Sequence, residues 1–214
     1  YLNSLKWDGT ERIRYALTRY LGAEDSEYTY ECLRLFMLGA IRRVFKPGCK
    51  FEVMLCLVGG QGAGKSTFFR LLAVKDEMSE MIATANAKSI EDIKSFISRA
   101  KETYKVPYET NPADRLRQCV FGGSSNTLDF LPLDRSGNRR FLPIMVHAEN
   151  AKVHILEDEA ASRAYIELMW AEAMFFYHNF PVRLTLSKEM NKELKVLQRQ
   201  FMPEDTKAGL IQSF

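Results

Sequence analysis

The chain has 214 residues, of which 46% are hydrophobic and 27% charged, so it can bury the core of one large or two small domains. Its 30 basic and 27 acidic residues leave a formal net charge of +3, which is too small to indicate nucleic-acid binding by itself. No apolar run reaches the ~18–20 residues of a membrane span, and no signal peptide is expected, which argues against membrane and secreted proteins. The cysteines lack C-x-x-C spacing, which argues against a zinc site. These features predict a cytoplasmic protein.

The first 48 residues are predicted to form a helical N-terminal subdomain. From Glu11 to Leu21 the apolar residues recur at helical spacing, and Gly22 is a typical helix end. Residues 28–45 are apolar on most sides, which is typical of a well-buried helix. Pro47 and the glycine after it then break the chain before the next element.

A glycine-rich octet at residues 59–66 follows an apolar run of strand length, residues 51–58, and precedes a helical pattern over 67–73. It fits G-x-x-x-x-G-K-[ST], in which glycine N–H groups and the helix N-terminus face phosphates, Lys65 reaches the β- and γ-phosphates, and Ser66 offers a hydroxyl to Mg²⁺. The alternative is a glycine-rich turn with a chance GKS. We predict a site for ATP and Mg²⁺. Its binding residues are Gly59, Gly60, Gln61, Gly62, Ala63, Gly64, Lys65, Ser66 and Thr67.

An acidic strand is missing after this loop. A nucleoside triphosphatase of this kind needs a strand that delivers Asp or Glu to Mg²⁺ and to the attacking water, but no such pattern lies between residues 67 and 117. The chain also leaves too few residues for the crossover that a parallel strand requires. Either the protein lacks this strand, or a segment near residues 76–78 is absent and the numbering runs through the gap. We favour the second; a Cα–Cα distance well above ~3.8 Å between Lys75 and Glu80 would reveal it.

Residues 49–150 are predicted to form the nucleotide-binding core and residues 151–214 a C-terminal helical segment. Pro143 suggests that its strand lies at a sheet edge. Three scattered histidines, His147, His154 and His178, indicate neither catalysis nor a metal site. The remaining predicted elements are helices over 89–101, 158–179 and 187–201, and strands over 118–122 and 141–146.

Several of these segments together resemble the virulence-associated protein E domain family, over most of residues 1–180. The segments that carry the resemblance are residues 1–9, 47–51, 59–66, 94–99, 104–108, 124–126 and 137–141. The family comprises replication ATPases of phages and mobile islands that are similar to superfamily 3 helicases and often follow a primase domain. The resemblance implies an α/β fold: a P-loop NTPase core of the AAA+ type, with a helical N-terminal layer and C-terminal helices.

The resemblance also assigns catalytic roles. Residues 77–81 look like the second half of the family's acidic motif, so Glu80 is the candidate that binds Mg²⁺ and activates water, unless this stretch is an exposed acidic turn. Asn126 would sense the γ-phosphate, unless it caps a turn. Either Arg139 or Arg140 would act as an arginine finger on a neighbouring subunit, which requires a homo-oligomeric ring, most simply a hexamer; the alternative is a solvated charge pair.

Basic and aromatic residues alternate around residues 99–108, where related helicases have a loop or hairpin facing a DNA channel. Side chains of this kind bind backbone phosphates and stack on bases. The alternative is a solvated helix end with core tyrosines, and Arg115 and Arg117 are weaker candidates. The predicted DNA-binding residues are Arg99, Lys101, Tyr104 and Lys105.

The sequence therefore predicts ATP hydrolysis coupled to binding and unwinding of single-stranded or forked DNA in the replication of a phage or mobile element, with a possible primase domain or partner. Three alternatives stay open. They are a DNA-stimulated ATPase that loads or remodels without unwinding, a small-molecule kinase, and a DNA-binding scaffold whose nucleotide site is inactive.

Overall fold

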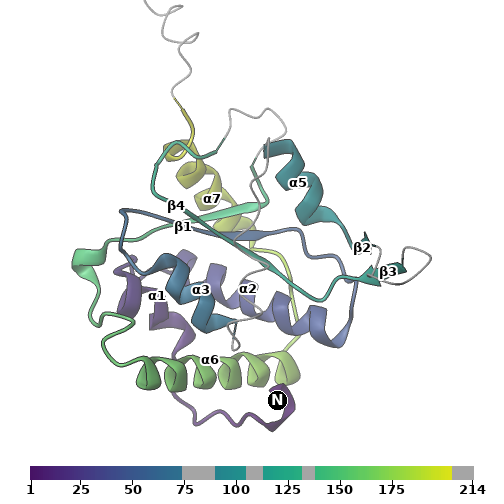
Figure 1. The fold of residues 1–214 in the computed structure, drawn as a ribbon, viewed down its shortest axis with the longest axis horizontal. Coiled ribbons are helices and arrows are strands. Elements are labelled where there is room, and N and C mark those ends of the chain that lie inside the picture. Colours follow the sequence, from purple (N-terminus) through teal and green to yellow (C-terminus); the bar gives the residue numbers. More distant parts are fainter. Residues whose placement is uncertain (74–89, 105–112, 132–137, 204–214) are drawn as a thin grey trace, which may run out of the picture.

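A computed structural model describes residues 1–73, 90–104, 113–131 and 138–203. The protein is a mixed α/β molecule built on a three-stranded sheet (Figure 1). The strands are β1 (Met54–Val58), β4 (Phe121–Ser125) and β5 (Phe141–Met145), in the order β4-β1-β5. Both outer strands run parallel to β1, and Met54 pairs with Phe121 on one side and Phe141 on the other. All three carboxyl ends therefore lie at one edge of the sheet.

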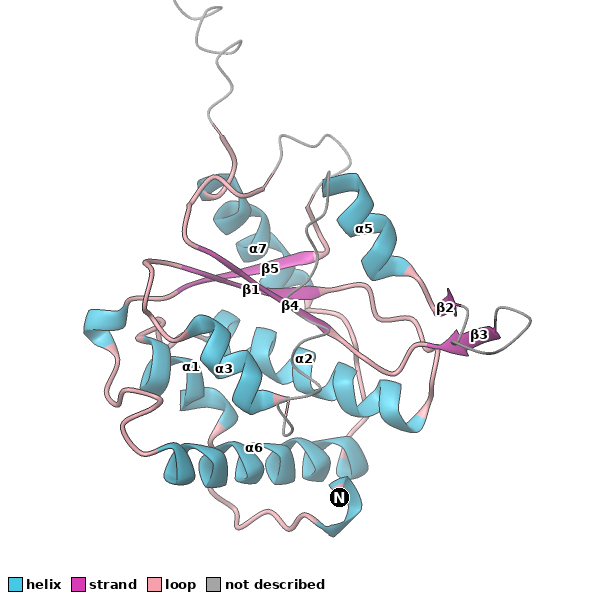
Figure 2. Cartoon of the chain, viewed as in Figure 1, coloured by secondary structure: helices cyan, strands magenta, loops and turns pink. Residues whose placement is uncertain are grey.

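Helices cover both faces of this sheet (Figure 2). Alternate residues of β1 point to opposite faces: Leu55 and Leu57 enter the larger hydrophobic cluster, whereas Cys56 and Val58 enter the smaller one. The larger cluster lies against α1 (Ile13–Leu21), α2 (Glu27–Phe45), α3 (Lys65–Leu72) and α6 (Glu159–Asn179). The smaller cluster includes residues of α5 (Ile90–Ser98) and Phe201, which caps the C-terminus of α7 (Lys188–Gln200).

Polar contacts connect the helices to the sheet. The Trp170 indole N–H in α6 donates to the Leu72 carbonyl at the end of α3, 3.1 Å away. The Tyr28 hydroxyl in α2 donates to the Pro143 carbonyl in β5, at 3.1 Å. The larger cluster draws on all three predicted segments, 1–48, 49–150 and 151–214; the division into these segments stays a prediction.

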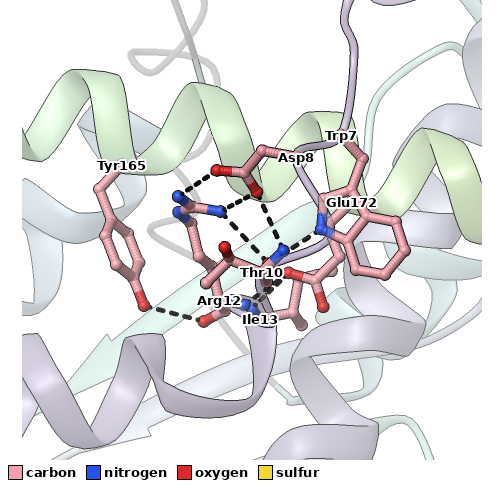
Figure 3. Close-up of polar contacts among 7 residues, drawn as sticks. All are labelled: Trp7, Asp8, Thr10, Arg12, Ile13, Tyr165 and Glu172. Atoms are coloured by element: carbon pink, nitrogen blue, oxygen red, sulfur yellow. Dashed lines mark hydrogen bonds and ion pairs between the residues drawn. The ribbon is translucent and has the colours of Figure 1, made fainter.

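The N-terminus of α1 is capped from another helix (Figure 3). Arg12 precedes the helix without a capping bond of its own side chain, and Glu172 of α6 takes that role: its Oε2 accepts from the Arg12 N–H at 2.7 Å and the Ile13 N–H at 3.0 Å. The Arg12 guanidinium holds the pKa of Asp8 well below its usual range, mainly through a side-chain hydrogen bond. Tyr165 donates its hydroxyl to the Arg12 carbonyl at 3.2 Å. Burial raises the pKa of the Glu172 carboxyl.

The predicted helices and strands of the described chain are confirmed, with shifted bounds. The strand predicted over 118–122 lies at Phe121–Ser125, and Pro143 does lie in an edge strand of this sheet. The pattern did not predict the antiparallel hairpin of β2 (Lys101–Tyr104) and β3 (Ala113–Leu116), or the short 3-10 helices η1 (Leu2–Ser4) and η2 (Ala148–Asn150). The predicted gap near residues 76–78 lies outside the described residues.

None of the helices that the structure describes is long and apolar enough to cross a membrane.

Candidate functional site

The glycine loop leaves β1 at the carboxyl edge of the sheet, where it meets the ends of both neighbouring strands. The Gly59 N–H donates to the Ser125 carbonyl of β4 at 3.1 Å, and the Val146 N–H after β5 donates to the Val58 carbonyl at 2.8 Å. A Cβ on Gly59 would lie 2.3 Å from the Val146 carbonyl oxygen, so only glycine allows this approach. The loop is therefore anchored on both sides.

Gly64 joins the loop to α3. Its φ of 78° places it in the left-handed region, and it caps the N-terminus of the helix, which begins at Lys65. A Cβ on Gly64 would stand 3.3 Å from Ile155 and 3.5 Å from Leu21, so the outer side of the turn is packed. The first backbone N–H groups of a helix lack helical partners, and they carry its positive dipole end. This end of α3 opens onto the loop.

The Lys65 ammonium is held over the loop by oxygen atoms. Nζ donates to the Gly59 carbonyl at 2.7 Å, the Gly60 carbonyl at 2.6 Å and the Asn126 Oδ1 at 3.0 Å. The residue is only 6% exposed, and burial lowers the pKa of Lys65. All three acceptors are neutral, so the positive charge is hydrogen-bonded but not neutralised by them. An anion in the loop would supply the missing charge.

A pocket of about 390 Å³ lies over the loop, within the size range of small-molecule sites. Lys65 and Asn126, which directly follows β4, are among the residues that line it. None of the described residues that line the pocket is Asp or Glu. The lining residues are Gln61, Gly62, Ala63, Gly64, Lys65, Ser66, Thr67, Ser124, Asn126, His154, Ile155 and Leu156.

The predicted nucleotide-site residues differ in where the structure places them. The loop, Lys65, Ser66 and Asn126 come together in this pocket. Glu80, the predicted acid for Mg²⁺ and water, lies outside the described residues. Within the described part of the chain, no three His, Cys, Asp or Glu side chains gather as a metal site would require. Binding of ATP and Mg²⁺ stays a prediction.

The two candidate finger arginines lie at the opposite edge of the sheet. They precede β5, and the Met54 N–H at the start of β1 donates to the Arg140 carbonyl at 2.7 Å. The Arg140 Nε donates to the Ser98 hydroxyl in α5 at 2.9 Å, which holds that side chain against α5. Arg139 is exposed.

Three of the four predicted DNA-binding residues lie on or beside the hairpin of β2 and β3, at one side of the molecule (Figure 2). Arg99 precedes β2 and is exposed, with its guanidinium 5.7 Å from the Phe96 ring centre. Lys101 forms an ion pair with Asp114 on the facing strand. Tyr104 ends β2, and Lys105 lies outside the described residues.

Arg117 is an anchor of this hairpin rather than a DNA contact, because it is only 3% exposed. Its Nη2 and Nε donate to the Glu102 carboxylate of β2 at 2.7 and 3.0 Å. Its guanidinium lies 4.7 Å from the ring centres of both Phe96 in α5 and Phe121 in β4. The hairpin is thus fixed to the strand that ends beside Asn126.

The sequence pattern missed one wall of the pocket, formed by His154, Ile155 and Leu156. No motif spacing marks these residues, since they follow β5 and η2 and reach the loop only through the fold. The exposed Leu156, two positions after His154, is a weak signal that spacing rules do not detect.

The chain can be placed in a class and then in a family. Its fold is α/β with a parallel sheet and a glycine loop at the carboxyl edge. Residues 2–78 and 75–203 match the model of the virulence-associated protein E-like domain, so the chain belongs to that family. The two matched stretches overlap at residues 75–78. No similar sequence was found among curated proteins.

Two solved structures of the C-terminal region of NrS-1, both of the apo A form, are similar to this chain. One has a TM-score of 0.53 at 16% identity and is matched over 90% of this chain and 52% of its own. The other has a TM-score of 0.56 at 16% identity, over 92% of this chain and 53% of its own. The chain therefore spans about half the length of these structures. At this identity the likeness supports the fold alone.

Proposed function

We propose that this protein is a P-loop NTPase of the AAA+ or superfamily 3 helicase type that hydrolyses ATP and couples it to DNA in the replication of a phage or mobile element. One observation carries the proposal: the buried Lys65 ammonium lies at the head of α3, over a glycine loop, and its hydrogen-bond acceptors within the described part of the chain are all neutral oxygen atoms. A polyphosphate is the anion whose charge and shape fit such a loop. Membership of the family is consistent with a role in replication.

The proposal gives roles to the glycine loop and to four side chains. Backbone N–H groups of the loop bind the phosphates, and Lys65 turns from the loop carbonyls to the β- and γ-phosphates. Ser66 and Glu80 would hold Mg²⁺, which would supply positive charge beside the phosphates. Asn126 contacts Nζ, which supports a role in sensing the γ-phosphate and positioning water.

We assign the finger to Arg139 and a positioning role to Arg140. Both residues lie at the amino edge of the sheet, and the glycine loop lies at the carboxyl edge, roughly 13 Å away along a five-residue strand. An arginine there serves a neighbouring subunit's pocket better than its own, which favours a homo-oligomeric ring. Arg140 is engaged with Ser98, whereas the exposed Arg139 is available to a partner.

The hairpin is the proposed DNA contact. Arg99 and Lys101 would meet backbone phosphates, and Tyr104 would stack on a base. Arg117 connects this hairpin to β4, and Asn126 follows β4, so β4 links the proposed DNA contact to the proposed γ-phosphate position.

Steady-state ATP hydrolysis, with and without single-stranded DNA, tests this function. We expect single-stranded DNA to stimulate hydrolysis and Lys65→Ala to abolish it. We expect Glu80→Gln to bind ATP without hydrolysing it. Strand displacement by the same sample separates a helicase from an ATPase that loads or remodels. Robust hydrolysis indifferent to DNA would contradict the proposal.

A nucleotide-dependent DNA-binding scaffold is a second candidate, because no Asp or Glu lines the described part of the pocket. It predicts that ATP binds without turnover, and that Glu80→Gln leaves ATP-dependent DNA binding unchanged.

A further inference from the structure

The wall that sequence spacing missed is held in place by the end of α1. The Lys152 and Val153 N–H groups donate to the Arg19 carbonyl at 2.9 and 3.1 Å, and the His147 N–H donates to the Leu21 carbonyl at 2.9 Å. The last carbonyls of a helix lack helical partners, and here they bind the segment after β5. The wall is therefore a fixed part of the site.

Two side chains of this wall are free to meet a ligand. Ile155 is 1% exposed and packs beside Gly64, so it supports the loop. Leu156 is 45% exposed, although it lines a pocket whose other side chains are mostly polar. His154 is exposed too, and its Nδ1 accepts from the Leu156 N–H at 3.3 Å. In the neutral ring this leaves the proton on Nε2, as a donor.

The strand order sets the direction of a bound nucleotide. Asn126 follows β4 on one side of β1, whereas His154 and Leu156 follow β5 on the other side. The γ-phosphate belongs on the Asn126 side, where Lys65 and Asn126 meet. A chain of phosphates crossing the loop then brings the nucleoside to the β5 side.

We propose that His154 and Leu156 form the nucleoside-binding edge of this pocket and make it select nucleotides over bare polyphosphate. This rests on the proposed function. Leu156 packs against the face of the base, which removes an exposed apolar side chain from water. The Nε2–H of His154 donates to an acceptor on the base or ribose. Their roles are in specificity and binding, and neither residue takes part in the reaction.

Calorimetric titration of the full chain with ATP, ADP and inorganic tripolyphosphate, each with Mg²⁺, tests the edge. We expect Leu156→Ala and His154→Ala each to weaken ATP and ADP binding by about fivefold to tenfold and to leave tripolyphosphate binding unchanged. Leu128→Ala and His147→Ala are matched controls, because both residues are exposed and neither lines the pocket; they should bind all three probes like wild type. Thermal unfolding verifies that every variant is folded.

The outcomes separate this inference from the proposed function. If Leu156→Ala and His154→Ala bind ATP like wild type, the proposed nucleoside-binding edge is wrong. It is also wrong if these variants lose as much affinity for tripolyphosphate as for ATP. Neither result contradicts the phosphate site. If wild type binds ATP no better than tripolyphosphate, the edge is equally wrong. If wild type binds none of the three probes, both the proposed function and this inference are contradicted.

Discussion

At the scale of single residues, Lys65 is the most informative side chain of the molecule. The Lys65 ammonium is 6% exposed and donates to two carbonyls and an amide oxygen, and none of these acceptors, which are the ones found among the described residues, carries a charge. Burial lowers the pKa of Lys65, because it disfavours the charged ammonium. Phosphate binding at this position would favour the charged form of Lys65.

Arg139 and Arg140 offer a matched pair of neighbours. In an assembled sample, Arg139→Ala should lower the rate of ATP hydrolysis by about 10³-fold, because an arginine finger stabilises transition-state charge. Arg140→Ala loses the hydrogen bond to Ser98 and should retain hydrolysis within several-fold. ATP affinity should be unchanged in both.

Mixing gives the control for action between subunits. Arg139→Ala subunits keep an intact pocket, and Lys65→Ala subunits keep an intact Arg139, so the mixture should recover hydrolysis that neither variant has alone. No recovery, together with full activity of Arg139→Ala, would contradict the assignment.

At the scale of elements, α1 depends on a carboxylate from α6. Glu172 is fully buried and its Oε2 accepts from two N–H groups, whereas its Oε1 has no hydrogen-bond partner among the described residues. Glu172→Ala leaves both N–H groups unsatisfied and should lower the free energy of unfolding by about 2–4 kcal/mol. Glu172→Gln keeps an acceptor without the buried charge and should change it by less than about 1 kcal/mol.

The same carboxyl predicts a pH dependence. Burial raises the pKa of Glu172 in the folded state, so the folded protein binds this proton more tightly than the unfolded chain. Its contribution to stability is full below the unfolded pKa and is lost as pH rises through the folded pKa. Urea unfolding at several pH values should show this decline in wild type and a smaller one in Glu172→Gln. Equal slopes, or a Gln variant as unstable as the Ala variant, would contradict it.

Most elements could be predicted from the sequence because their periodicity is local. The apolar spacing of α1 and α6 and the apolar run of β1 identify them directly. Periodicity did not predict the hairpin because Lys101–Tyr104 and Ala113–Leu116 mix charged and apolar residues over only four positions each, and their pairing depends on the partner strand and on Arg117. In Phe121–Ser125, two glycines and two serines weaken the strand pattern and shift its predicted bounds.

The candidate site was predictable where a motif is contiguous. The loop and Lys65 lie in one octet, and the contact of Asn126 with Lys65 follows from adjacent parallel strands. His154 and Leu156 were not predictable, because their place in the pocket depends on hydrogen bonds to the end of α1.

At the scale of the whole molecule, the two edges of the sheet have different proposed partners. The carboxyl edge bears the pocket, and the amino edge bears the arginine pair. The hairpin of β2 and β3 lies on the amino side of the sheet (Figure 1). Strands β1 and β4 connect these edges through a rigid parallel register. In a ring, the amino edge of one subunit would face the nucleotide of the next.

The central claim is that the glycine loop binds a nucleoside triphosphate through Lys65. Equilibrium titration of ATP with Mg²⁺ into wild type and Lys65→Ala tests it most directly, with the exposed Lys188→Ala as control. We predict binding by wild type and by the control, and affinity at least about 100-fold lower for Lys65→Ala, since a charged phosphate contact is lost. Equal ATP affinity of Lys65→Ala and wild type, or no binding by wild type, would contradict the claim.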